Sequence, residues 1–214
     1  TTTLGFKKLF NLYLIFILIC FQGFLGWYMV QSGLVYDIDV SHFRLSVHLL
    51  FAFIILSLIF WCYLKTKVKI NLENTINLIF PLGFLFLIFL QIIIGAFVSG
   101  MDAGKIYNSW PLMGNSIFPD DNEYVNLFKL SAFSDPSLVQ FIHRKLAYLI
   151  GFFYLYLLFK IYKNKMIHLY KSINIVGILI LLQIVLGIFT LLYGAQILIA
   201  SMHQISSIFL VTSC

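Results

Sequence analysis

The stretch Phe141-Ile-His-Arg-Lys-Leu-Ala-Tyr148 decides how this chain is interpreted, because it places a histidine inside a long apolar run. His143 lies about two helical turns into that run, which corresponds to membrane depth rather than to a loop. An ionisable residue inside a membrane segment predicts a functional site, since burying it in lipid is costly. His48 and His203 follow the starts of two other apolar runs in the same way.

The composition excludes a soluble globular domain. Apolar residues make up 61% of the 214 residues and charged residues only 10%. The three cysteines (Cys20, Cys62 and Cys214) all lie in apolar runs, so neither a disulfide framework nor a Cys-x-x-Cys metal site is expected. The chain is therefore predicted to be all-α, a polytopic membrane helix bundle.

Six apolar segments come close to or exceed the roughly 20 residues that a helix needs to span a bilayer. The fourth has the clearest start, with Asp135 as the N-cap and Pro136 in the first turn. A long loop, residues 101–134, joins the third segment to the fourth. The expected helices cover about residues 9–35, 43–64, 75–100, 136–159, 173–193 and 197–214.

The charges predict how the bundle is oriented. Nine of the 14 lysines and arginines fall on one side if the helices alternate: Lys7, Lys8, Lys65, Lys67, Lys69, Lys160, Lys163, Lys165 and Lys171. Seven of the eight acidic residues fall on the other side, and Glu73 is the exception. The positive-inside rule places the lysine loops in the cytoplasm or its equivalent. The net charge of +6 is thus a topology signal, and no nucleic-acid partner is expected.

With this topology, His48, His143 and His203 all lie roughly 9 Å inside the outer boundary. A lone histidine at such a depth is equally well explained as a buried core residue whose hydrogen bonds are made within the protein. Three histidines at one depth favour cofactor ligands. Cys, Asp and Glu are missing at that depth, which disfavours zinc or di-iron, whereas haem needs only axial ligands. The other two histidines, His42 and His168, are better explained as interfacial residues.

A Gln-x-x-x-Gly motif recurs near the outer ends of the first, third and fifth segments, at residues 22–26, 91–95 and 183–187. The glycines are explained by close packing of helices through small residues. Each motif precedes a histidine helix, so the repeating unit is a helix pair. Residues 1–72 would form one pair of an N-terminal half and residues 73–214 a C-terminal four-helix half. A two-fold repeat of four helices then requires another pair before residue 1, and we expect this N-terminal pair to be absent from the chain.

Five stretches, taken together and in this order, resemble the haem A synthase family over nearly the whole chain. They are Gln22–Leu34, Val40–Leu50, Asp102-Ala-Gly-Lys-Ile-Tyr-Asn-Ser-Trp-Pro-Leu-Met113, Val139–Tyr148 and Ala200–Gln204. The resemblance is closest to the alphaproteobacterial and mitochondrial branch, since the other bacterial branch carries outer-loop cysteine pairs that this chain lacks.

The resemblance implies an eight-helix protein of two pseudo-symmetric halves, each with a histidine pair for haem. His143 and His203 match the C-terminal pair, which would bind haem b. His48 matches one ligand of the N-terminal site, where the substrate haem O would react. Its partner histidine and the catalytic acid would lie in the absent helix pair. Arg144 would pair with a haem propionate or extend to the membrane interface.

The implied reaction oxidises a peripheral methyl of haem O to the formyl group of haem A, for cytochrome oxidase biogenesis. The protein would be a membrane oxidoreductase of the bacterial inner membrane, or of the mitochondrial inner membrane in a eukaryote. Haem O synthase would supply the substrate, while the electron acceptor and a homo-oligomeric state are left open.

Two other functions are compatible with intramembrane histidines. A bis-histidine b-type cytochrome, an electron-transfer subunit, would share the depth pattern but not the Asp-Ala-Gly and Pro-Leu-Met loop. A transporter is disfavoured by the scarcity of intramembrane carboxylates and broken helices.

The loop at 101–134 is long enough to indicate a function of its own. Its residues Tyr124, Leu127, Phe128 and Leu130 predict a short amphipathic helix. Such a helix would lie on the membrane or cap the haem pocket, or else be an interfacial segment without a catalytic role.

Overall fold

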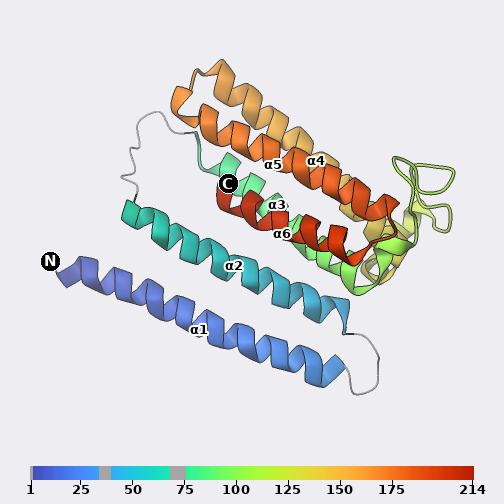
Figure 1. Cartoon of the computed structure of the whole chain (residues 1–214), viewed down its shortest axis with the longest axis horizontal. Coiled ribbons are helices and arrows are strands. Elements are labelled where there is room, and N and C mark those ends of the chain that lie inside the picture. The colour runs from blue at the N-terminus through green and yellow to red at the C-terminus, as the bar shows by residue number, and fades with distance from the viewer. Residues whose placement is uncertain (1, 34–39, 68–75) are drawn as a thin grey trace. The chain divides into compact units, whose positions relative to one another are not determined.

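The computed structural model describes residues 2–33, 40–67 and 76–214, and this part of the chain is helical apart from its turns and the long loop (Figure 1). Six α-helices are present, as the sequence predicted. They are α1 (Thr2–Gly33), α2 (His42–Lys67), α3 (Ile79–Gly100), α4 (Pro136–Lys163), α5 (Tyr170–Leu192) and α6 (Ile197–Ser213).

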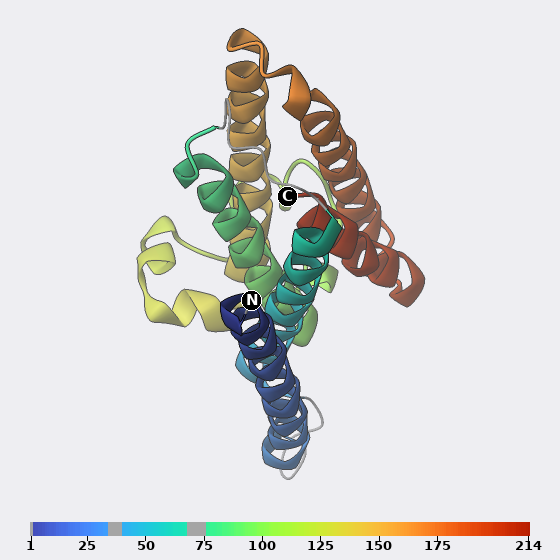
Figure 2. The same ribbon diagram turned by 90° about the vertical axis from the view of Figure 1, so that its left-hand side faces the viewer.

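The helices belong to two compact units, residues 1–73 and residues 74–214. In the first unit, α1 and α2 form an antiparallel pair in which the rings of Phe21 and Phe51 meet edge to face, 5.1 Å apart (Figure 1). In the second unit, α3 packs against α4 and α5 packs against α6 (Figure 2). The boundary predicted between residues 72 and 73 lies outside the described residues.

Membrane insertion explains the helical structure, because a helix satisfies its own backbone hydrogen bonds in lipid. Five helices of the described chain are long and apolar enough to cross a membrane, and α6 is a shorter apolar helix of 17 residues. Many large apolar side chains are exposed, among them Phe16 on α1 and Phe152 on α4. Exposed apolar side chains on helices of this length suit a lipid environment, so the chain is a multi-pass membrane protein.

The fourth helix begins as the sequence predicted. The side chain of Asp135 accepts a hydrogen bond from the backbone N–H of Leu138 at 3.0 Å, and Pro136 occupies the first turn. The helix extends to Lys163, four residues beyond the predicted end at Phe159. The ammonium group of Lys160 lies 3.4 Å from the centre of the Phe80 ring, a cation–π contact. This contact stabilises the charge of Lys160 beyond the end of the apolar segment.

Other predicted helix ends differ as well, and α1 begins at Thr2 rather than near the predicted start at Leu9. Residues 76–78 were expected to be helical but are not, because the side chain of Asn77 accepts the N–H of Ile79 and starts α3 there. Helix α5 begins at Tyr170, earlier than predicted, and the Tyr170 ring stacks on that of Tyr162 at 4.2 Å. The predicted end of the first helix at Val35, the predicted start of the third at Thr75, and Lys69 lie outside the described residues.

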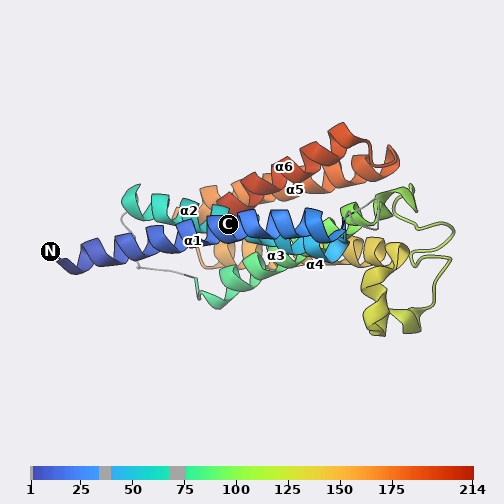
Figure 3. The same ribbon diagram turned by 90° about the horizontal axis from the view of Figure 1, so that it is seen from below.

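The short amphipathic helix expected in the long loop is divided into two shorter helices. These are two five-residue 3-10 helices, η2 (Tyr124–Phe128) and η3 (Leu130–Ser134), drawn in yellow beyond α3 and α4 in Figure 3. Leu127 packs inward against a small cluster that contains Phe118 and Leu138, whereas Phe128 and Leu130 are 90% and 88% exposed. Because the segment breaks at Lys129, its apolar side chains do not share one helical face.

Candidate functional site

His48, His143 and His203 occupy equivalent positions in their helices. Each follows the first residue of its helix by six or seven positions, in helices that begin at His42, Pro136 and Ile197. Each side chain is half-buried. The prediction that the three histidines stand one to two turns inside their helices is therefore consistent with the observed helix starts.

A glutamine of the preceding helix binds the backbone of each histidine. The side-chain amides of Gln22, Gln91 and Gln183 donate to the carbonyls of His48, His143 and His203 at 2.9, 3.1 and 3.2 Å. Each bond joins the two helices of one hairpin. The glutamine of the Gln-x-x-x-Gly motif therefore fixes the axial position of the histidine helix relative to the helix that precedes it.

The glycine of the same motif faces the imidazole ring. A Cβ atom placed on Gly26, Gly95 or Gly187 would come within 3.2 Å of the Cε1 atom of the facing histidine. That distance is shorter than a carbon–carbon van der Waals contact, so a larger residue would displace the ring. Close packing of helices was the role expected of these glycines; the structure shows that the group packed against them is the histidine ring.

The glutamine contacts were missed at the level of sequence, although a signal for them existed. The glutamine stands four residues before the glycine in all three motifs, and each motif helix is followed by a histidine helix. That regularity marks one structural unit repeated three times, in which Gln, Gly and His contact one another.

One ring nitrogen of each histidine has no hydrogen-bond partner within the described part of the chain. The buried atoms are Nδ1 of His48, His143 and His203. Buried polar atoms are normally hydrogen-bonded, so each of these rings keeps one polar atom without a partner, and a neutral imidazole is a common metal ligand. Across residues 2–33, 40–67 and 76–214, no three side chains of His, Cys, Asp or Glu converge as a chelating set. The donors present thus fit a metal that takes one or two imidazoles, as haem iron does.

His143 and His203 belong to the same unit, on α4 and α6. Each is packed against the glutamine and glycine of its own hairpin. His48 belongs to the first unit and lies against Gln22 and Gly26 of its own hairpin. The two histidines expected to be interfacial lie elsewhere: His42 begins α2, where its ring meets that of Phe43, and His168 lies in the short η4 helix (Ile167–Leu169).

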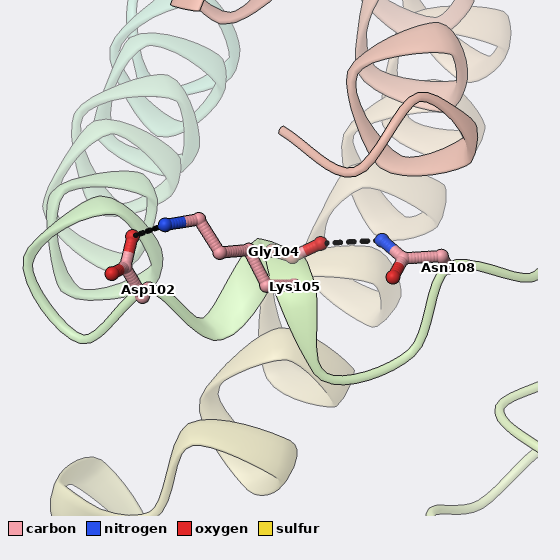
Figure 4. Close-up of polar contacts among 4 residues, drawn as sticks. All are labelled: Asp102, Gly104, Lys105 and Asn108. Atoms are coloured by element: carbon pink, nitrogen blue, oxygen red, sulfur yellow. Dashed lines mark hydrogen bonds and ion pairs between the residues drawn. The ribbon is translucent and has the colours of Figure 1, made fainter. Parts of the chain in front are cut away.

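The long loop begins with the Asp-Ala-Gly motif (Figure 4). Lys105 pairs with Asp102 at 2.9 Å across the short η1 helix (Ala103–Lys105), and Asn108 donates to the Gly104 carbonyl at 3.0 Å. The same Asn108 amide donates to the carbonyl of Leu191 at the end of α5, at 2.8 Å. The loop is thereby fastened to the end of α5, in the third hairpin.

Polar side chains on one face of α4 hold the rest of the loop. Arg144 donates to the carbonyls of Tyr107 and Ser109 at 3.0 Å and to that of Leu112 at 3.2 Å. One turn earlier, Gln140 donates to the Tyr107 carbonyl at 3.1 Å. Arg144 follows His143 directly, so the residue expected to pair with a haem propionate also fixes the loop next to the histidine. Its Nε atom is buried and has no partner in the described chain.

Asp121 completes the attachment of the loop. Its carboxylate accepts hydrogen bonds from Ser137 at the start of α4, at 2.6 Å, and from the hydroxyl of Tyr107, at 2.9 Å. Burial acts to raise the pKa of Asp121, but these hydrogen bonds outweigh it, so the pKa lies below the ordinary value of 3.8. Burial and the bond to Asp121 raise the pKa of Tyr107 above 10.0. At neutral pH the pair is therefore a carboxylate held by a protonated phenol.

Comparison with known proteins shows what this chain is similar to. A family model described as cytochrome oxidase assembly protein (COX15-CtaA) matches residues 5–214. The chain is 48% identical over 215 residues to a haem A synthase of Pelagibacter ubique, which covers 99% of this chain and 63% of the relative. It is 41% identical over 211 residues to a haem A synthase of Rickettsia bellii, covering 96% and 62%. The chain therefore spans somewhat less than two thirds of the length of these relatives.

Proposed function

We propose, because this chain belongs to the COX15-CtaA family of cytochrome oxidase assembly proteins, that it acts as a haem A synthase. The reaction would oxidise a peripheral methyl group of haem O to the formyl group of haem A. Haem O synthase would supply the substrate. The observation that carries the proposal is the threefold recurrence of a glutamine-held, glycine-packed histidine in the membrane segments.

His143 and His203 would be the axial ligands of a resident haem b. They share one unit, and each has a buried ring nitrogen that is not hydrogen-bonded. Imidazoles from facing helices are a common way to hold haem in a bundle. The haem would supply the electron-transfer chemistry, while the protein orients it and controls its surroundings.

His48 would ligate the substrate haem O. It has the same glutamine and glycine contacts as the other two histidines, which supports an equivalent role in a separate half of the protein. The family likeness and these repeated contacts also support an eight-helix architecture with a pseudo-two-fold axis, of which this chain contributes six helices.

Arg144 and the long loop would cover the outer end of the haem b site. The guanidinium group holds loop carbonyls beside His143, and this placement would keep water from the ligand nitrogen. The unpartnered Nε atom of Arg144 is the group that would remain for a haem propionate.

The haem content of the purified chain tests this proposal. The chain would be produced in cells that make haem O, and the extracted haem would be examined as its pyridine complex. We expect haem b, together with haem O or haem A. His143→Ala should lose haem b, and His48→Ala should lose the haem O or haem A. If haem b alone is present in wild type and both variants, the protein is instead a b-type electron-transfer cytochrome.

A further inference from the structure

The three glutamine amides do not bind their histidines identically. Besides the backbone carbonyl, the amides of Gln22 and Gln91 approach the ring Nε2 atoms of His48 and His143, each at 3.2 Å. The amide of Gln183 instead donates to the hydroxyl of Ser206 at 2.8 Å. In the described part of the chain, the Gln183 amide makes no hydrogen bond to the His203 ring. The third hairpin therefore departs from the other two at one bond.

Ser206 explains the difference. It stands three residues after His203, is buried, and donates its own hydroxyl to the His203 carbonyl at 2.9 Å. Its oxygen is then the acceptor nearest to the Gln183 amide. The corresponding positions after His48 and His143 are Phe51 and Leu146, neither of which has a hydroxyl group. Their glutamines therefore have the ring nitrogen as the second acceptor.

This difference matters for metal binding because a neutral imidazole has a single in-plane lone pair. An amide N–H that donates to the ring occupies the lone pair that an iron ion would need. The amide and the iron thus compete at His48 and His143, whereas no amide competes at His203.

We propose that Ser206 keeps His203 ready to bind haem iron by holding the Gln183 amide away from its ring. His143, the other member of the pair, binds iron only when the Gln91 amide leaves its Nε2 atom. The inference rests on the proposed haem-binding role of His143 and His203. It makes Ser206 a positioning residue that sets which ligand of the pair is engaged first.

A measurement without haem tests the hydrogen bonds themselves. Nitrogen-15 NMR of the full chain labelled at histidine distinguishes a ring nitrogen that accepts a hydrogen bond from one that does not. His48 and His143 should show an accepting Nε2 atom, and His203 should not. In Ser206→Ala, the freed Gln183 amide should turn to the ring, and His203 should adopt the pattern of the other two. An accepting Nε2 on His203 in the wild-type protein would overturn the proposal.

A titration with ferric haem b tests the consequence. Ser206→Ala should weaken haem binding by about threefold to tenfold, the effect of one competing neutral hydrogen bond. Ser207→Ala removes a neighbouring hydroxyl that bonds to the Gln204 carbonyl and should bind haem like wild type. In a Gln183→Met background, which lacks the competing amide, Ser206→Ala should have no further effect.

The two experiments separate the possible failures. Equal haem affinities of Ser206→Ala and Ser207→Ala would overturn the role of Ser206 while leaving the haem site intact. If the wild-type chain binds no haem through two histidines, the proposed function fails, and the NMR pattern still decides whether Ser206 diverts the amide.

Discussion

The imidazole of His143 lies so close to Gly95 that a Cβ atom on the glycine would come within 3.2 Å of its Cε1 atom. A Cβ atom on Gly26 or Gly187 would come equally close to the Cε1 atom of His48 or His203. Three hairpins that share only a short motif thus hold a histidine ring in the same contact. Because the same close contact recurs in three hairpins, the glycine is expected to determine where the histidine ring lies.

Replacing Gly95 with alanine should therefore move the ring. The added methyl group must be accommodated by a shift of a few tenths of an ångström, and overpacking of this kind costs about 1–3 kcal/mol. We expect Gly95→Ala to bind haem about tenfold more weakly and to shift the electron paramagnetic resonance signal of the low-spin haem. Gly83→Ala on the same helix is the control, because its Cβ would lie at an ordinary 3.9 Å from Phe153. Identical spectra for both variants would refute the role of the close contact.

Replacing either histidine of the second unit should remove one and the same haem. His143→Ala and His203→Ala should each abolish the low-spin b-type signal, because a bis-histidine centre needs both ligands. Circular dichroism should show that the helices persist. His168→Ala, in the short η4 helix, serves as the control. A complete bis-histidine spectrum in either of the first two variants would disprove their pairing.

Substitution of Arg144 should separate its attachment of the loop from its proposed contact with a haem propionate. Lysine keeps the positive charge but cannot donate to three carbonyls at once. In Arg144→Lys the loop should lose hydrogen bonds that contribute about 1.5–3 kcal/mol each, and amide hydrogen exchange at residues 105–113 should accelerate at least about tenfold. Lys145→Met is the matched control, because Lys145 lies over the Phe141 and Tyr148 rings. If haem is lost from Arg144→Lys while loop protection is unchanged, Arg144 acts on the cofactor instead.

The attachment of the loop should weaken in acid. The pKa of Asp121 is lowered in the folded chain, so its carboxylate stabilises the loop fully above the ordinary value of 3.8. This contribution is lost as the pH falls through the lowered pKa. Carbon-13 NMR of the carboxyl group should show titration below 3.8, and Ser137→Ala should move the pKa of Asp121 upward because it removes a hydrogen bond to the carboxylate. An unchanged pKa in Ser137→Ala would show that the bond to Ser137 does not determine it.

The sequence by itself determined the features that depend on neighbouring residues. The number of α-helices follows from the apolar runs, and the start of α4 follows from Asp135 and Pro136, because hydrophobic length and capping act within a few residues. The position of each histidine inside its helix follows for the same reason. Helix ends were less accurate where side chains from elsewhere act on them, as at Lys160, which lies over the ring of Phe80.

Only the tertiary structure decided which groups meet across helices. The bond from Gln91 to His143 joins residues 52 positions apart, and the bonds from Arg144 reach 32 to 37 positions back into the loop. The diversion of Gln183 from His203 to Ser206 depends on two acceptors that lie within reach of one amide. Which acceptor a side chain bonds to depends on the packing distance and rotation of the neighbouring helices. The apolar pattern of either helix alone does not specify these, because a lipid-embedded helix is apolar on all its faces.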